Sequence, residues 1–306
     1  MRKTLTQALL AATLMVSALG GTARAEDPNS LTEDEVKEAV QFIYGNAIFV
    51  LLHEVGHMFI SELQLPVLGR EEDAVDALST ILLLEARDET LDTAITDSAD
   101  GWFLSDQERE KAGGEQAFWD AHALDKQRAY QMVCLMVGQD ADGFKEFADS
   151  LDFPQERREE CKYEYEKTLS SWSGLLTPHA MPDGGKNTIK VTYEEPAEEL
   201  QPYAQMMKDA KLLETISESF AGLYKLNDGI QFVATTCGQP NAFWVPSERK
   251  LVYCYELASY HDQLISKWLV ENRENGDDQQ SSSDQQGSED EQSTDDQQKG
   301  ASVSSQ

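Results

Sequence analysis

The sequence predicts an α+β protein that is mainly helical, with a small β element in its C-terminal half. Apolar residues recur at helical spacing through residues 32–84 and again in several later segments. The alternation of residues 189–193 and the apolar run at 230–235 instead indicate strands. Residues 241–244 and 250–255 flank a turn-like segment, which favours a hairpin.

The first 25 residues have the pattern of an export signal. Arg2 and Lys3 precede an apolar run from Ala8 to Gly21, and Ala23–Ala25 supplies a small-x-small cleavage site. No other stretch approaches the roughly 20 apolar residues that a membrane span requires. We therefore expect cleavage after Ala25 and a mature protein that is periplasmic or secreted, without stable membrane insertion.

The chain is strongly acidic. Its formal net charge is −31, and the predicted signal carries three basic residues and no acids, so the mature chain is more negative still. Such a chain should repel nucleic acids and anionic membrane surfaces. Residues 271–306 consist almost entirely of Asp, Glu, Gln, Ser and Gly, which predicts a disordered acidic tail after a folded domain at 26–270.

Four cysteines remain in the predicted mature chain, and an even number in an exported protein indicates disulfides. Sequence alone allows three pairings. We favour Cys134–Cys161 and Cys237–Cys254 because the members of each pair are close in sequence.

Thr32 and Glu35 form the T-x-x-E capping box that opens a helix. The apolar spacing then predicts a helix to about Leu63, either continuous or broken near Gly45 and Asn46. A turn follows this helix because Pro66 cannot continue it.

The later segments alternate between loops and helices. Residues 88–117 are polar and contain three glycines, so we expect a loop with a short helix there. A loop rich in Gly and Pro is expected at 178–187. Helical patterns are found at 118–138, 139–175, 197–225 and 260–270.

The first predicted helix contains His53-Glu54-Val55-Gly56-His57, an H-E-x-x-H motif. The four-residue step is about one helical turn, so both imidazoles lie on one face and can hold one zinc ion. Glu54 then lies beside the metal, where it can take a proton from bound water. The alternative is a solvated face with two histidines, but the flanks are apolar and the chain has only five histidines.

A hydrolytic zinc site needs a third protein ligand. The segment from Arg70 opens a second helix, and Glu72 is the preferred ligand, with Glu71, Asp73 and Asp76 as rivals. Asp76 lies one turn after Glu72 and can accept the spare N–H of a zinc-bound histidine. The acidic cluster is also typical of a helix N-terminus without a metal.

His122 is a candidate for stabilising the oxyanion of the reaction, and Tyr130 is a weaker one. A surface or packing role explains His122 equally well. His179 and His261 lie outside the motif, and we expect no metal role for either.

Five short runs share their pattern with one family: G-N-A-x-x-V-L-L-H-E-V-G-H at 45–57, L-P-V-L-G-R-E-E-D-A-V-D at 65–76, H-A-L-D-K-Q-R at 122–128, C-G-Q-P-N-A-F at 237–243 and C-Y-E-L at 254–257. Together they resemble a little-characterised family of exported bacterial metallopeptidases within the zincin group. The resemblance covers most of residues 32–270. It implies zinc at His53 and His57, with Glu54 as catalytic base.

Glu72 and Asp76 are also similar to the glutamate-zincin arrangement, in which a helical glutamate binds the metal and an aspartate one turn later supports a histidine. The resemblance thus implies a zincin-like metal helix followed by a second, glutamate-bearing helix. In the best-known members of that group a sheet precedes the metal helix, whereas here the strand patterns mostly follow it.

The leading hypothesis is zinc-dependent hydrolysis of peptides or proteins outside the cytoplasm. One alternative is a catalytically inactive zinc-binding scaffold on the same fold. Another is an exported interaction protein in which the motif is fortuitous and binds no metal.

Overall fold

The computed structural model describes residues 30–292, so the predicted export signal lies outside the described residues. The α-helices are α2 (Glu33–Leu63), α3 (Glu71–Ala86), α4 (Glu89–Lys111), α5 (Asp125–Gln139), α6 (Lys145–Ser150), α7 (Gln155–Leu176), α8 (Gln201–Asp209), α9 (Leu212–Ala221) and α10 (Tyr255–Gln292). The strands are β1 (Ile189–Tyr193), β2 (Ile230–Thr235), β3 (Ala242–Val245) and β4 (Lys250–Cys254). The protein is mainly helical with a small mixed sheet, as predicted.

Helix α2 is the central element of the fold. Its capping box forms as predicted: the Glu35 N–H donates to Thr32 Oγ1 at 3.3 Å, and the Thr32 N–H donates to the Glu35 carboxylate at 2.7 Å. The helix is continuous through Gly45, where an added Cβ would lie 3.0 Å from Ala94 of α4. This glycine therefore allows two helices to approach closely and does not interrupt the helix.

Helix α4 occupies the segment for which the sequence predicted a loop with a short helix, so that prediction was wrong. Asp88 caps the helix by accepting the N–H of Thr90 at 3.0 Å. Gly101 is a packing residue, because a Cβ there would collide with the side chain of Asn46 on α2. The buried apolar residues recur at helical spacing: Leu91, Ala94, Ile95, Ala99 and Phe103. The polar residues that indicated a loop lie mostly between these positions.

The sheet has the strand order β1-β2-β4-β3. The pairs β1–β2 and β2–β4 are parallel, and β3 pairs antiparallel with β4 at one edge. Both predicted strands and the predicted hairpin are therefore confirmed. Every strand in the described part of the chain follows α2, which differs from the order in the best-known zincins.

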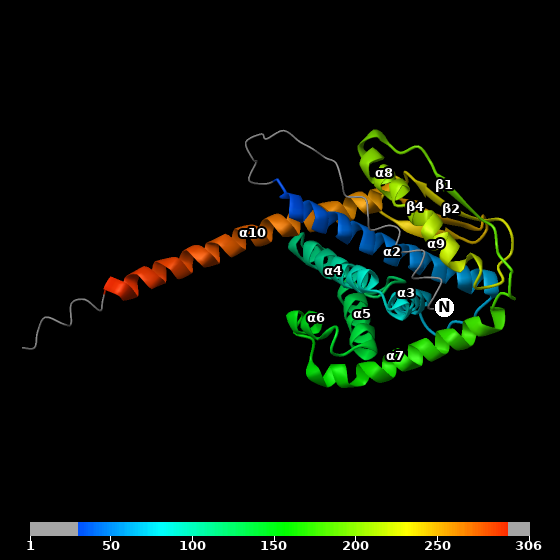
Figure 1. The fold of residues 1–306 in the computed structure, drawn as a ribbon, viewed down its shortest axis with the longest axis horizontal. Helices are drawn as coiled ribbons and strands as arrows, with labels where there is room; N and C mark the ends of the chain where they lie inside the picture. Colours follow the sequence, from blue (N-terminus) through cyan, green and yellow to red (C-terminus); the bar gives the residue numbers. More distant parts are fainter. Residues whose placement is uncertain (1–29, 293–306) are drawn as a thin grey trace, which may run out of the picture.

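Figure 1 shows the sheet and α9 on one side of α2, with α3, α4, α5 and α7 on the other. The hairpin is tied to α2 by a bidentate ion pair in which Arg249 Nε and Nη2 each lie 2.8 Å from the Glu62 carboxylate. Because Glu62 is near the end of α2, this pair holds the hairpin, and with it the edge strand β3, beside α2.

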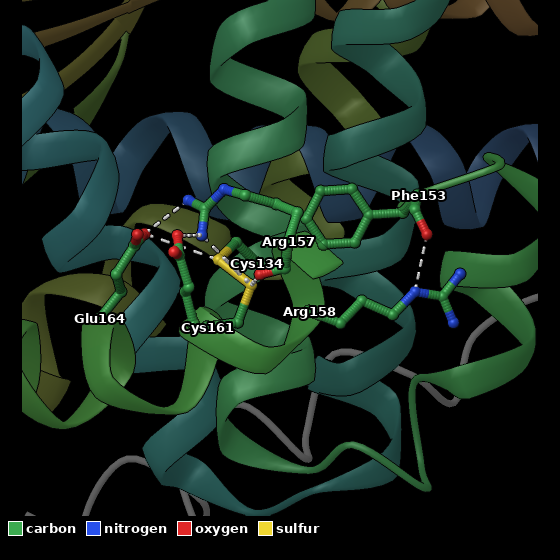
Figure 2. Close-up of a disulfide and its surroundings, with 7 residues drawn as sticks. Cys134, Phe153, Arg157, Arg158, Cys161 and Glu164 are labelled. Atoms are coloured by element: carbon green, nitrogen blue, oxygen red, sulfur yellow. Dashed lines mark hydrogen bonds and ion pairs between the residues drawn. A yellow bond between two sulfur atoms is a disulfide. The ribbon is translucent and has the colours of Figure 1, made fainter. Parts of the chain in front are cut away.

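Both predicted disulfides form. Cys134 on α5 is bonded to Cys161 on α7, and Cys237 is bonded to Cys254 at the end of β4. Figure 2 shows the first bridge between its two helices, with the ion pair of Arg157 and Glu164 beside it. The second bridge ties the β2–β3 connection to the start of α10.

Several helix boundaries differ from the prediction. The segment predicted to be helical from residue 118 becomes helical only at Asp125, so His122 lies on a loop. Pro154 separates α6 from α7, and Lys211, with a positive φ of 50°, separates α8 from α9. Prolines and left-handed residues end helices whose apolar spacing continues on both sides.

Helix α10 starts earlier and ends later than the predicted 260–270. Its first turns pack against α2 and α4, and its later part extends away from the rest of the protein (Figure 1). A helix satisfies its backbone hydrogen bonds locally, so it can continue beyond the residues that bury apolar surface. The disorder predicted for the tail at 271–306 remains a prediction: α10 continues to Gln292, and residues 293–306 lie outside the described residues.

By length and composition alone, α2 is apolar enough to cross a membrane, so the prediction that no stretch after residue 25 approaches such a span was wrong. However, 83% of its most apolar window is buried inside the protein. A core helix of a soluble protein passes the same test.

Candidate metal centre

Three donor atoms from α2 and α3 converge at the centre of the structure. His53 Nε2 lies 3.2 Å from His57 Nε2, as expected for one helical turn on one face. Glu72 Oε2 lies 3.1 Å from His53 Nε2 and 3.3 Å from His57 Nε2. The structure thus brings together the two histidines and the glutamate that the sequence singled out.

The opposite ring nitrogens are held by two other carboxylates of α3. The Nδ1–H of His53 donates to Asp76 at 2.8 Å, as predicted, and the Nδ1–H of His57 donates to Glu71 at 2.8 Å. With both Nδ1 atoms acting as donors, the neutral rings present lone pairs at Nε2. Glu71 and Asp76 therefore orient the histidines, which leaves the inner position to Glu72.

This donor set fits a divalent cation. Lone pairs of three acceptors repel one another at such short range unless a proton or a cation lies between them. In a tetrahedral zinc site with bonds of about 2.0–2.1 Å, neighbouring donor atoms are about 3.3 Å apart. The three separations observed here are 3.1, 3.2 and 3.3 Å. Asp73, the remaining rival, is in neither His-containing group of described residues that could hold a metal ion.

The electrostatics of the site favour positive charge. Burial opposes the charged form of His57, but the carboxylates of Glu72 and Glu71 outweigh it and raise the pKa of the ring to about 9. Burial likewise opposes the charged form of His53, yet its hydrogen bonds to Asp76 and Glu72 raise its pKa. Burial raises the pKa of Glu72, but contacts with His122 and the two motif histidines hold it well below its usual range. A bound cation would take the place of the protons that these rings otherwise carry.

Asp76 is itself held by a residue to which the sequence analysis gave no role. Arg128 of α5 binds Asp76 in a bidentate ion pair, with Nε and Nη2 each 2.7 Å from a carboxylate oxygen. The guanidinium stacks on the ring of Trp102 at 3.6 Å. Burial raises the pKa of Asp76, but the charge of Arg128 lowers it further, to about 2. His53 is thus fixed by a chain of buried contacts that ends in α4.

The proximity of Arg128 to the motif was invisible in the sequence because 52 residues separate it from Asp76. Its position in the run H-A-L-D-K-Q-R was the available signal. The role of Glu71 was missed for another reason: adjacent carboxylates at a helix start cannot be ranked from sequence alone.

Glu54 is buried against the metal donors, with 5% of its surface exposed. Burial raises the pKa of its carboxyl, while the nearby motif histidines and a backbone hydrogen bond from Trp244 of β3 lower it. A carboxylate with a raised pKa accepts a proton more readily at neutral pH. The position therefore suits the base that the sequence predicted.

His122 lies on the loop between α4 and α5, at the open side of the site. Its Nε2 is 3.0 Å from Glu72 Oε2, and its ring stacks on the His53 ring at a centroid distance of 6.4 Å. Its other nitrogen contacts Asp120 at 3.0 Å. The structure brings His122 into the cluster, whereas Tyr130 packs between Phe103 and Phe153.

A cavity of about 480 Å³ opens beside His53 and Glu54. Its walls come from α2, α4, the loop that carries His122, the start of α5, the residues before β3, and α10. His261 of α10 lines this cavity and is in neither His-containing group of described residues that could hold a metal ion. The site is therefore a cluster of donor atoms that could hold a metal ion, at one end of a substantial cleft.

Comparison with known proteins supports a metal-dependent activity. A family model, DUF4344, described as “Putative metallopeptidase”, matches residues 16–176 and 193–285. The match includes every residue of the metal cluster and the lining of the cleft. No curated protein and no solved structure matches the chain significantly.

Proposed function

The chain belongs to the family described as “Putative metallopeptidase”, and from this premise we propose that it is a zinc-dependent peptidase that acts on peptides or proteins outside the cytoplasm. The observation that carries the proposal is the converging set of His53 Nε2, His57 Nε2 and Glu72 Oε2. Two histidines and a carboxylate are a ligand set of hydrolytic zinc sites, which keep one position for water.

Zinc bound there would lower the pKa of a bound water and polarise the scissile carbonyl. The protein's own contribution begins with Glu54, whose buried carboxylate takes the proton of the attacking water and passes it to the leaving amine. His53, His57 and Glu72 hold the ion. Asp76 and Glu71 fix the rings of the two histidines, so the donor atoms are oriented before substrate arrives.

Strand β3 provides a surface for the substrate backbone. It is an edge strand, and the N–H of Trp244 points to Glu54 instead of to β4. An extended peptide can add to such an edge through main-chain hydrogen bonds. We propose that substrate lies along β3, which would place a peptide bond over the metal donors.

The proposal is tested with the metal-loaded mature protein and its Glu54→Gln variant. We expect one zinc per chain in both, measured by elemental analysis after dialysis, because Glu54 is not a ligand. Cleavage of an unfolded protein substrate should fall by a factor of about 10² or more in the variant, since general base catalysis is lost. Full activity in Glu54→Gln, or absence of zinc from the wild type, would contradict the proposal.

One observation favours a second candidate function, an inactive zinc-binding protein. His122 Nε2 is close enough to Glu72 to act as a fourth ligand, and structural zinc sites are closed by four protein ligands. In the peptidase, His122 instead stabilises the oxyanion from the loop. His122→Ala distinguishes the two: it should lower turnover in the peptidase with little loss of zinc, and it should weaken zinc binding strongly in a closed site.

Export rests on the signal pattern of residues 1–25. Expression of the full chain in a bacterial host, followed by N-terminal sequencing of the periplasmic and medium fractions, tests it. We expect a mature N-terminus after Ala25. An uncleaved chain retained in the cytoplasm would contradict this part of the proposal.

A further inference from the structure

The residues that line the cleft beside the metal donors indicate which class of substrate it binds. Its volume of about 480 Å³ lies in the range of pockets that enclose a ligand group. It extends from His53 and Glu54 towards α10, so a substrate group next to the scissile bond would enter it. The polar groups on its walls therefore indicate which side chain it accepts.

His261 lies in the wall that α10 contributes and is 7% exposed. Its Nδ1 is buried and has no hydrogen-bond partner among the described residues. Its neighbours include the aromatic rings of Phe42 and Tyr260. Unpaired buried polar atoms are rare in folded proteins, so this nitrogen, on a residue that lines the cavity, is a candidate partner for a bound ligand. Burial lowers the pKa of this ring to about 3, so at neutral pH it is uncharged, and the tautomer with its proton on Nε2 leaves a lone pair on Nδ1.

Two other polar groups of the cleft, the side-chain carbonyl of Asn46 and the carboxylate of Asp125, are acceptors without a hydrogen-bond partner within the described residues. Asn46 is 5% exposed and donates both amide hydrogens to backbone carbonyls, those of Phe42 at 2.9 Å and Asp97 at 3.0 Å. Only its carbonyl oxygen remains for a ligand. Asp125, at the start of α5, lines the same cleft, and its carboxylate has no hydrogen-bond or ion-pair partner within the described residues. Burial raises the pKa of Asp125 more than nearby positive charges lower it.

The arginines that line the cleft are already paired. Arg128 is held by Asp76, and Arg109 pairs with Asp106 and with the backbone of Gly114. Both guanidinium groups are therefore engaged, whereas Asp125 has no ion-pair partner within the described residues and feels Arg128 and Arg109 only at longer range. A guest that brings several N–H donors and a positive charge fits this balance of groups.

We propose that this cleft is a side-chain pocket for lysine or arginine and that the enzyme cleaves peptide bonds next to basic residues. The inference rests on the proposed function, and it names the substrate class. Asp125 pairs with the cationic head of the side chain, while Asn46 and His261 accept its remaining hydrogen bonds. The negative charge of the chain as a whole would draw basic peptides towards the site.

Equilibrium binding tests the pocket without requiring turnover. Zinc-loaded Glu54→Gln protein is titrated with fluorescent peptides that differ at one position, which carries lysine, arginine, norleucine or citrulline. We expect the lysine and arginine peptides to bind about 10- to 100-fold more tightly than their neutral counterparts, the usual range for a charge-assisted hydrogen bond. Adding Asp125→Asn should remove most of this preference.

Two further variants make the result specific. Asp142→Asn removes the same charge from an exposed position between α5 and α6, outside the cleft, and should leave the preference within about threefold. His261→Phe keeps a planar ring but removes the acceptor, so it should weaken the binding of the lysine and arginine peptides and leave that of the neutral peptides unchanged. Equal binding of lysine and norleucine peptides, or a preference that survives Asp125→Asn, would overturn the assignment.

Cleavage by the wild-type protein separates this inference from the proposed function. Cleavage sites in an unfolded protein, mapped by mass spectrometry, should cluster beside lysine and arginine. Hydrolysis without that clustering would support the peptidase activity and refute the assignment of the cleft to basic side chains. Binding of basic peptides that depends on Asp125, in a protein that cleaves none of them, would support the pocket for basic side chains and refute the peptidase activity.

Discussion

The buried pair of Asp76 and Arg128 offers a sharp test of how the site is held. Asp76 accepts hydrogen bonds from His53 and twice from Arg128, all at 2.7–2.8 Å. Both side chains of the pair are less than a tenth exposed. Arg128→Met leaves the Asp76 carboxylate buried without its cation, and breaking a buried pair in this way costs about 3–5 kcal/mol. That is a large part of the roughly 5–15 kcal/mol that stabilises a typical domain.

The double variant Asp76→Leu/Arg128→Met separates stability from metal binding. Replacing both members of a buried pair by apolar side chains is often neutral or stabilising, so most of the lost stability should return. Zinc affinity should not return, because His53 still lacks the acceptor for its Nδ1–H. Loss of such a partner weakens metal binding by about 10–100-fold.

Urea unfolding of the chelator-treated proteins measures the first effect, and competition with a chelator of known zinc affinity measures the second. Arg128→Lys is the matched control, because it keeps the charge but not the bidentate geometry, and it should fall between wild type and Arg128→Met. Wild-type zinc affinity in the double variant would refute the role of Asp76. A loss below about 1 kcal/mol in Arg128→Met would refute a buried pair.

Three other predictions concern the titration, packing and covalent bonds of the site. In metal-free protein the pKa of His57 is raised from 6.5 to about 9, so the stability that its protonation contributes is fully present below pH 6.5 and is lost as pH rises through 9. Thermal melting of chelator-treated protein should show this loss. Zinc affinity should instead weaken as pH falls, because protons compete for the ring. Gly56→Ala places a Cβ 2.7 Å from the Val75 side chain, so α3 must shift; unfolding stability should fall by about 1–3 kcal/mol, together with zinc affinity. Cys237→Ala/Cys254→Ala opens a loop of 17 residues and should cost about 3 kcal/mol in urea unfolding.

Each of these predictions has a result that would contradict it. A zinc affinity that does not change between pH 6 and 9 would mean that protons do not compete for the His57 ring. Gly174→Ala is the control for the packing variant, because a Cβ there meets nothing within 4 Å. It should stabilise α7 by about 0.5–1 kcal/mol, so a similar gain in Gly56→Ala would refute the tight contact. Unchanged stability without the second bridge would show that the hairpin holds itself in place.

The proximity of His53, His57 and Glu72 was predictable because its signals are local. The H-E-x-x-H step is set by helix geometry, and the capping box at Thr32 fixes where that helix starts. Glu72 and Asp76 are also one turn apart on a single helix, so their relation could be read from spacing. Two helices joined by a short turn then meet closely enough to bring both sets of donors together.

The rest of the site depends on tertiary packing that no spacing reveals. Helix α4 looked like a loop because polar residues separate its buried positions and because it contains Gly101, which packs against Asn46 of α2. Arg128 reaches Asp76 only because α5 packs against α3 and α4. His122 was assigned to a helix, yet it approaches Glu72 from a loop whose course the local pattern does not determine.

The metal donors and the cleft are built from different helices, so a change in one need not alter the other. The metal donors and their carboxylate partners all come from α2 and α3, whereas the cleft also uses α10. Helix α10 begins at Tyr255, directly after Cys254, so the second disulfide fixes the start of the element that carries His261. Reduction of that bridge should therefore alter peptide preference more than zinc affinity. If zinc affinity fell by as much as the preference, the donor atoms of α2 and α3 would depend on the C-terminal half of the chain for their arrangement.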